Sequence, residues 1–196
     1  PLRRQRQMCI RDRVIRKGIE IDYQHHFEHE IKEWLKNKKF DFTIGSVHYI
    51  NHELIGYQLV TRKNLKEIYN TYFDEVTHSI KSGIFTVIGH VDLVSRYGNP
   101  TKYELKSFDY WEKVETILEE IMKKRIHLEI NTKGLRENYK DTMPSKEVVK
   151  KFIEKGGKLI SIGSDAHATE EIGYGIEEIL NFLAKHNGNK LKILFE

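Results

Sequence analysis

The chain has 196 residues, enough for one domain with a sizeable hydrophobic core, and its 39% hydrophobic and 32% charged residues are typical of a globular protein. No apolar run approaches the roughly 20 residues that a membrane helix needs, and no secretory leader is evident, which argues against a membrane protein. The net charge of +4 suits an anionic substrate, but the sequence has no basic stripe with interleaved aromatic residues that would indicate nucleic-acid binding. The single cysteine, Cys9, excludes an intrachain disulfide framework and favours a reducing cytoplasm.

Residues 1–13 differ from the rest of the chain. They contain five arginines and follow neither a helical nor a strand period. We interpret them as a basic arm, a tag or a sequencing artefact that does not match the domain, with an anion-binding tail as the alternative. Residues 14–196 are expected to form a single domain of β/α units.

From residue 14 onward, strand patterns alternate with helical patterns. Short apolar runs predict the strands, and apolar residues spaced three or four apart predict the helices, with Asn64, Ser145 and Thr169 as N-caps. Loops are expected at 48–62, 91–103 and 131–141. In chain order, the expected elements are a strand at 14–23, a helix at 27–37, a strand at 41–47, a helix at 64–81, a strand at 84–89, a helix at 108–124, a strand at 125–131, a helix at 145–155, a strand at 158–163, a helix at 169–186 and a strand at 191–195.

This alternation indicates an α/β fold with a parallel sheet and right-handed crossovers. Several strands end in residues that can bind metal. A barrel of β/α units gathers the carboxyl ends of all its strands around one mouth. An open doubly wound sheet would bring together only the strands that flank its switch point. Four contributing strands therefore favour a barrel.

The candidate ligands follow apolar strands and, in three cases, a glycine. Asp and His are two positions apart after the strand at 158–163, single histidines follow the strands at 41–47 and 84–89, and a glutamate lies between two isoleucines in the first strand. Imidazole and carboxylate together favour zinc, manganese or iron over magnesium or calcium. These donors exceed the needs of one tetrahedral zinc, so more than one metal is expected, with the glutamate able to bridge two ions. The five candidates are Glu20, His48, His90, Asp165 and His167.

A phosphate substrate would require a cationic group near these ligands. Arg136, in the loop after the fourth strand, is the first candidate for this group, and Arg96 is the second. Asp92 could orient a ligand, but a capping or turn role fits its position equally well. The sequence contains no phosphate-binding P-loop and no nucleophile elbow. Hydrolysis by water that a metal activates is the reaction these residues can support.

These motifs resemble the PHP (polymerase and histidinol phosphatase) family, and within it the monofunctional histidinol-phosphate phosphatases. The Gly-Ser-Asp-Ala-His sequence that ends in His167 is shared across the wider family. The Gly-Ser-Val-His sequence that ends in His48 and the Glu-Ile-Asn-Thr-Lys-Gly-Leu-Arg sequence at 129–136 resemble the histidinol-phosphatase branch. Together with the matches around Glu20 and His90, these stretches span nearly everything from residue 14 onward.

The resemblance implies a distorted TIM-like barrel with seven core strands and up to three zinc, manganese or iron ions. It implies that Glu20 bridges two ions, that His48 and His90 hold one of them, that Asp165 binds the other, and that His167 belongs to the third. By the same resemblance, Glu20, His90 and Asp165 are catalytic, and Arg136 and Asn131 bind the substrate. The implied activity is hydrolysis of L-histidinol phosphate, a small-molecule phosphate ester, in histidine biosynthesis.

One departure from the family pattern matters. Family members begin with a strand that carries a His-x-His pair, and nothing here matches it. We therefore expect a chain that is incomplete at its N-terminus and lacks the first one or two barrel strands. Three alternatives stay open: a PHP phosphoesterase with another substrate, a non-catalytic fragment that binds metal or anions, and the PHP module of a DNA polymerase, for which the chain contains no polymerase sequence.

Overall fold

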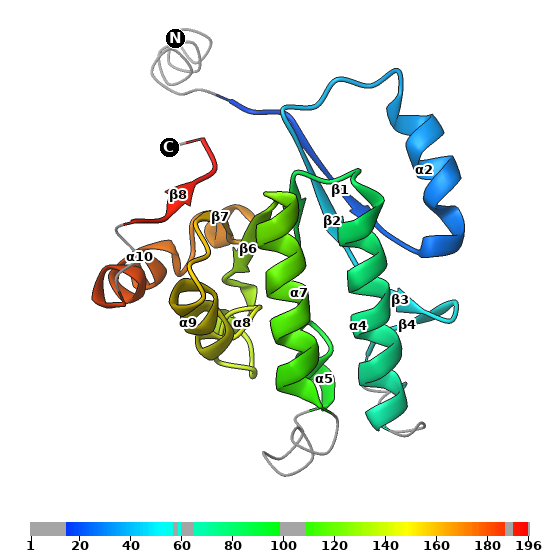
Figure 1. Cartoon of the computed structure of the whole chain (residues 1–196). Helices are drawn as coiled ribbons and strands as arrows, with labels where there is room; N and C mark the ends of the chain where they lie inside the picture. The colour runs from blue at the N-terminus through cyan, green and yellow to red at the C-terminus, as the bar shows by residue number, and fades with distance from the viewer. Residues whose placement is uncertain (1–14, 57–58, 60–64, 99–108, 187–189, 196) are drawn as a thin grey trace, which may run out of the picture.

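The structure is a computed structural model, and it describes residues 15–56, 59, 65–98, 109–186 and 190–195 (Figure 1). Six of its strands form one sheet in which neighbouring strands are parallel, and two further strands, β3 (Tyr49–Ile50) and β4 (Glu53–Leu54), form a separate antiparallel hairpin. The strands of the sheet, in their spatial order, are β1 (Gly18–Asp22), β2 (Phe42–Ser46), β5 (Val87–Ile88), β6 (His127–Asn131), β7 (Leu159–Gly163) and β8 (Lys192–Ile193).

Helices connect these strands. Four-residue helices occupy two of the expected loops, and two 3₁₀ turns follow strands β1 and β7. The helices are α2 (Glu28–Leu35), α4 (Leu65–Ser82), α5 (Ser95–Gly98), α7 (Tyr110–Lys124), α8 (Lys133–Arg136), α9 (Lys146–Glu154) and α10 (Ile176–Lys185), and the turns are η1 (His25–Phe27) and η2 (Thr169–Glu171).

The spatial order of the strands in the sheet is the same as their order along the chain. A doubly wound sheet would reverse direction at a switch point, whereas a β/α barrel adds its strands in sequence. The sheet is open between β1 and β8 in the described part of the chain, so its topology is that of a barrel wall rather than of a closed barrel. The rings of Phe42 and Phe195 nevertheless lie 5.6 Å apart, although Phe42 begins the second strand of the sheet and Phe195 follows the last. This contact shows that the wall is curved.

The hydrophobic core lies between the sheet and the helices that cover it (Figure 1). On β6, the buried residues Leu128 and Ile130 belong to this core and alternate with Glu129 and Asn131, as expected from the sequence. Helices α4, α7 and α9 contribute buried apolar residues at helical spacing, among them Val76, Leu118 and Phe152. The polar residues of β6 are therefore left for the other face of the sheet and for its carboxyl end.

The predicted helix at 169–186 is wrong in its first part. Thr169 begins the 3₁₀ turn η2, and α10 begins seven residues later with Gly175 as its N-cap residue. Gly173 and Gly175 have φ angles of +78° and +73°, a left-handed conformation that interrupts a helix. Ser145 caps α9 as predicted, since its hydroxyl accepts the N–H of Val148 at 3.4 Å. Asn64, the third predicted cap, lies outside the described residues, as does the arm at 1–13.

The expected loops at 48–62, 91–103 and 131–141 contain short regular elements. The first holds the β3–β4 hairpin, and the other two hold α5 and α8. Among the described helices, none has both the length and the apolar composition needed to cross a membrane.

Candidate active site

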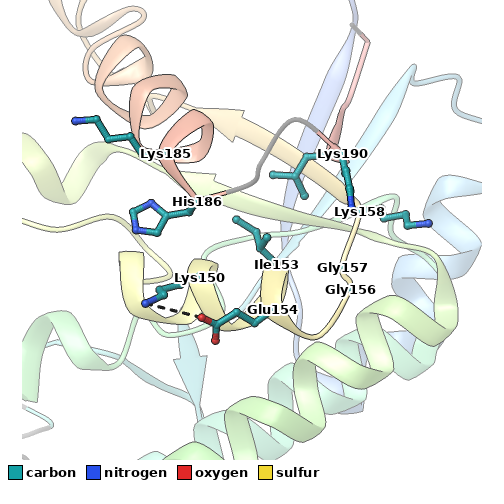
Figure 2. Close-up of a pocket in the computed structure, with 10 residues that line it drawn as sticks. Lys150, Ile153, Glu154, Gly156, Gly157, Lys158, Lys185, His186 and Lys190 are labelled. Atoms are coloured by element: carbon teal, nitrogen blue, oxygen red, sulfur yellow. Dashed lines mark ion pairs between the residues drawn. The ribbon is translucent and has the colours of Figure 1, made fainter.

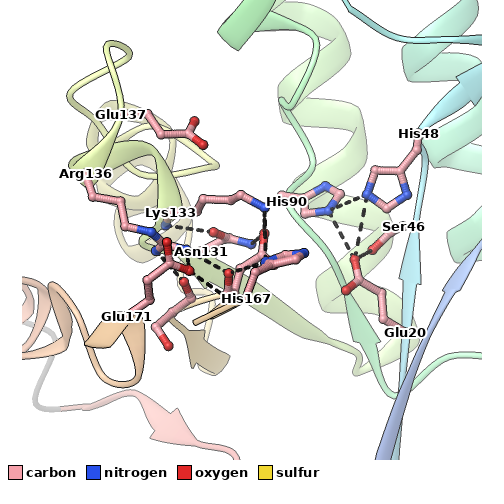
Figure 3. A network of polar contacts seen from close by, with 12 residues as sticks. Glu20, Ser46, His48, His90, Asn131, Lys133, Arg136, Glu137, His167 and Glu171 are labelled. Atoms are coloured by element: carbon pink, nitrogen blue, oxygen red, sulfur yellow. Dashed lines mark hydrogen bonds and ion pairs between the residues drawn. The ribbon is translucent and has the colours of Figure 1, made fainter. Parts of the chain in front are cut away.

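The candidate residues gather at the carboxyl ends of the parallel strands, where β/α barrels carry their chemistry (Figure 3). They form two neighbouring groups. The first group comes from β1 and from the residues that follow β2 and β5, and it contains Glu20, His48 and His90. The second comes from the end of β6, from α8 and from the loop after β7, and it contains Asn131, Lys133, Arg136, Asp165 and His167.

In the first group, three potential ligand atoms point toward one another. The Nε2 atoms of His48 and His90 lie 3.2 Å apart, and Glu20 Oε1 lies 3.3 Å from His90 Nε2 and 3.8 Å from His48 Nε2. His90 is buried, whereas Glu20 and His48 are partly exposed to solvent. The three side chains therefore form a cluster of nitrogen and oxygen ligand atoms in which Glu20 and His48 are accessible to solvent.

Asp22 fixes the orientation of His48. Its Oδ1 accepts the backbone N–H of His48 at 2.8 Å and lies 3.3 Å from His48 Nδ1. A carboxylate that holds one ring nitrogen while the other nitrogen faces the site is the usual arrangement around a histidine that binds metal. Asp22 was not selected from the sequence, although it lies two residues beyond Glu20 on the same strand.

Two contacts shape the carboxylate of Glu20. The hydroxyl of Ser46 donates to Glu20 Oε1 at 2.6 Å. The hydrogen bond with His90 lowers the pKa of Glu20 to about 2, against the opposing effect of burial. Glu20 is therefore an anion at neutral pH, which is the form that binds a cation.

The donor set of this group fits a divalent transition metal. Zinc bonds of about 2.0–2.1 Å in a tetrahedron separate the ligand atoms by about 3.3 Å. The separations of 3.2, 3.3 and 3.8 Å among Glu20, His48 and His90 are close to this value. Two imidazoles and one carboxylate also match the three-ligand pattern of zinc centres that keep a position open for water or substrate.

Glu129, on β6, lies between the two groups. Its Oε2 accepts the backbone N–H of His90 at 2.9 Å. Burial raises the pKa of Glu129 well above its usual range, and the carboxylates of Glu20 and Asp165 act in the same direction. The strand pattern predicts the face of β6 on which Glu129 lies, but it predicts no role for this residue.

The second group is held together by Lys133. Its Nζ lies 3.2 Å from Asp165 Oδ2 and 3.5 Å from His167 Nδ1. Asn131 donates its side-chain amide to Asp165 Oδ2 at 3.3 Å and accepts the backbone N–H of Lys133 at 2.9 Å. The side chain of His167 is 70% exposed, and its Nδ1 lies 2.9 Å from the carbonyl oxygen of Asp165. Among the five predicted ligands, Glu20, His48 and His90 therefore bring three ligand atoms within 4.8 Å of one another, whereas Asp165 and His167 form a pair, with Asp165 Oδ1 3.4 Å from His167 Nδ1.

Arg136 braces the loop that carries Asp165. Its guanidinium donates to the carbonyl oxygens of Ser164 and Asp165 at 2.6 and 2.7 Å and to Glu171 Oε2 at 3.1 Å. Asp165 has a φ angle of +47°, a left-handed conformation that is uncommon for a residue with a side chain. The two hydrogen bonds to carbonyl groups therefore hold a backbone turn that aims Asp165 at the site.

The remaining sequence candidates have structural partners. Arg96 pairs with Glu137 at 2.5 Å. Asp92 is buried, its Oδ2 accepts the N–H of Ser145 at 2.9 Å, and burial raises its pKa to about 7. Of the two roles considered for Asp92, the contact at the start of α9 is the one that the structure contains.

A cavity of about 700 Å³ lies at the opposite end of the sheet (Figure 2). Lys158 and Lys190, which line it, precede β7 and β8. Lys150, also in its lining, pairs with Glu154 at 3.8 Å. Because this cavity lies at the amino ends of the strands, it is separate from the candidate active site.

Comparison with known proteins places this geometry in a family. The probable histidinol-phosphatase of Thermotoga maritima is 32% identical over 90% of this chain and 67% of its own length. The histidinol-phosphatase of Lactococcus lactis is 27% identical over 94% of this chain and 70% of its own length.

Solved structures agree in fold. The crystal structure of the Lactococcus lactis histidinol phosphate phosphatase, complexed with zinc, L-histidinol and phosphate, matches with a TM-score of 0.78 and 25% identity, covering 98% of this chain and 73% of that one. A putative histidinol phosphatase from Listeria monocytogenes matches in fold with a TM-score of 0.73 and 22% identity, covering 90% of this chain and 72% of that one. The model of the PHP domain matches residues 5–133, and the chain belongs to the PHP domain family.

Proposed function

We propose that the chain is a metal-dependent phosphomonoesterase that hydrolyses L-histidinol phosphate to L-histidinol and phosphate. The observation that carries this proposal is the convergence of Glu20, His48 and His90 beside a group that contains Lys133 and Arg136. The first group offers donors for a cation, and the second offers positive charge for a phosphate. The relatives named histidinol-phosphatase support the choice of substrate.

We assign Glu20, His48 and His90 to one metal ion, and Asp165 and His167 to further ions, with up to three zinc, manganese or iron ions in all. Divalent ions bound there would neutralise phosphate charge and supply the activated water for hydrolysis. The exposed side chain of His167 can rotate away from the Asp165 carbonyl without disturbing a packed neighbour.

The protein's own residues position the substrate. Arg136 is assigned to the phosphate through the donor that now faces Glu171, while its contacts with the Ser164 and Asp165 carbonyl groups keep the guanidinium in place. Lys133 adds a second positive charge near Asp165. Asn131 holds both residues in place, because it hydrogen-bonds to the Asp165 carboxylate and to the backbone N–H of Lys133. Glu20, His90 and Asp165 are the proposed catalytic residues, because each is assigned to a metal ion at the rim where the phosphate would bind.

Phosphate release from L-histidinol phosphate tests the proposal. The metal-loaded protein is compared with a His90→Ala variant and with His127→Ala, a histidine at the amino end of the neighbouring strand β6. We expect turnover by the unchanged protein and by His127→Ala, and its loss in His90→Ala and after chelation. Turnover that survives in His90→Ala would contradict the metal argument, and a preference for another phosphomonoester would replace the substrate but retain the chemistry.

A further inference from the structure

A second set of metal-ligating side chains lies on the helical side of the molecule. It consists of His25 in turn η1 and of Glu75 and His78 on α4. One ligand atom from each residue lies within 4.8 Å of the corresponding atoms of the other two. None of these residues belongs to the active site described above, and the sequence pattern predicted no role for them.

Glu75 is the anchor of this set. It is 8% exposed, and its Oε2 lies 2.7 Å from His25 Nδ1 and 3.7 Å from His78 Nδ1. Its other oxygen, Oε1, accepts the backbone N–H of His25. The side chains of His25 and His78 are 60% and 51% exposed. A fixed carboxylate therefore lies beneath two imidazoles that an ion can reach from solvent.

The chemistry of the three donors suits zinc. Two imidazoles and one carboxylate leave a fourth tetrahedral position for water. Glu75 and His78 are three residues apart on one helix face, the Glu-x-x-His spacing through which helix bundles bind metals. A tetrahedral ion requires separations of about 3.3 Å, so His25 would move outward and His78 inward by about half an ångström each.

A simple ion pair between His25 and Glu75 explains less of this arrangement. His78 directs its Nδ1 toward the same carboxylate oxygen, so Glu75 Oε2 faces two imidazoles and not one. Two further imidazoles border the set: the rings of His25 and His26 lie 5.5 Å apart, and those of His26 and His52 lie 4.6 Å apart. His52 belongs to the turn of the β3–β4 hairpin, so histidines from three separate segments meet at this place.

We propose that His25, Glu75 and His78 bind one zinc ion that is distinct from the catalytic metal. The ion joins the turn after β1 to α4. This connection has a structural purpose, because α2, the helix that follows the turn, has no buried residue and so has little packing of its own. An ion that binds only the folded chain stabilises it by mass action.

Zinc stoichiometry and thermal stability test the proposal in a His48→Ala/His90→Ala background, in which the first catalytic group is removed. Adding His25→Ala/His78→Ala is expected to lower the bound zinc by one equivalent and to reduce the rise in melting temperature that zinc produces in this background. His29→Ala, an exposed histidine on α2, is the matched control and is expected to change neither quantity.

A second variant keeps the test decisive if the double substitution prevents folding. Glu75→Gln retains an oxygen that can accept the His25 N–H but removes the negative charge, so it should weaken zinc binding at this place while circular dichroism stays unchanged. An unchanged zinc equivalent in both variants would overturn the proposal. Because the background lacks His48 and His90, this result is independent of whether the phosphatase assay succeeds.

Discussion

Replacing Asp22 by asparagine tests whether this carboxylate orients His48 for metal binding. Asparagine keeps an oxygen for the backbone N–H of His48 but removes the charge that lies 3.3 Å from His48 Nδ1. Losing such a partner weakens metal binding by about 10- to 100-fold. Because the side chains of Asp22 and His48 are 29% and 35% exposed, solvent screens their interaction. We therefore expect the lower end of the range, about tenfold in zinc affinity, or about 1.4 kcal/mol.

Competition with a chromophoric chelator measures this affinity, in a His25→Ala/His78→Ala background so that the second set does not contribute. Asp41→Asn is the matched control, because Asp41 also accepts a backbone N–H, from Lys17 at 2.7 Å, but lies at the opposite end of the sheet. If Asp22→Asn bound zinc as tightly as its background, or if Asp41→Asn weakened binding equally, the orienting role of Asp22 would be refuted.

Three further predictions concern the site, alkaline stability and the core. Glu20→Gln should reduce zinc affinity, measured by the same competition assay, by more than about 100-fold, which is the upper limit for loss of a residue that only supports a ligand. An unchanged affinity would exclude Glu20 as a ligand. Burial raises the pKa of the Tyr23 hydroxyl above its ordinary value of about 10, so the folded chain keeps a proton that the unfolded chain releases. The free energy of unfolding should be unaffected by this group below pH 10 and fall above it, by at most about 1.4 kcal/mol per pH unit, and urea unfolding of Tyr23→Phe should show a shallower decline. Leu118→Ala on α7 should destabilise the fold by about 2–5 kcal/mol in urea unfolding, whereas Leu180→Ala, at a side chain that is 44% exposed, should stay within about 0.5 kcal/mol, and equal effects would contradict the assignment of the core.

The strands of the parallel sheet are the part of the molecule that the sequence predicts well. His48 and His90 each follow an apolar run that enters a parallel sheet, and the sheet itself brings their side chains together. The apolar runs predict the two strands, and the parallel pairing of these strands predicts that the residues after them lie close together. The start of α10 was mispredicted because apolar spacing continues through 169–186, whereas Gly173 and Gly175 adopt left-handed backbone angles that spacing does not reveal.

The supporting residues depend on distances that sequence does not contain. Lys133 lies beside Asp165 only because the loops after β6 and β7 fold against each other. Arg136 was selected for its charge, but its hydrogen bonds to two carbonyl groups follow from the conformation of the neighbouring loop. The set around Glu75 joins residues 50 positions apart, on a turn and a helix where histidines ordinarily contact solvent.

The sequential strand order determines where a further β/α unit could join the sheet. Each β/α unit contacts its neighbours in the sheet and ends at the same rim. At the outer edge, β1 and α2 border a groove of about 420 Å³ that contains Ile19, Ile21, Ile31 and Trp34. One more unit paired with this edge would place its own terminal loop next to Glu20 and leave the pairing of the other strands unchanged. A unit added at this edge would therefore extend the set of side chains around Glu20 without rebuilding the rest of the rim.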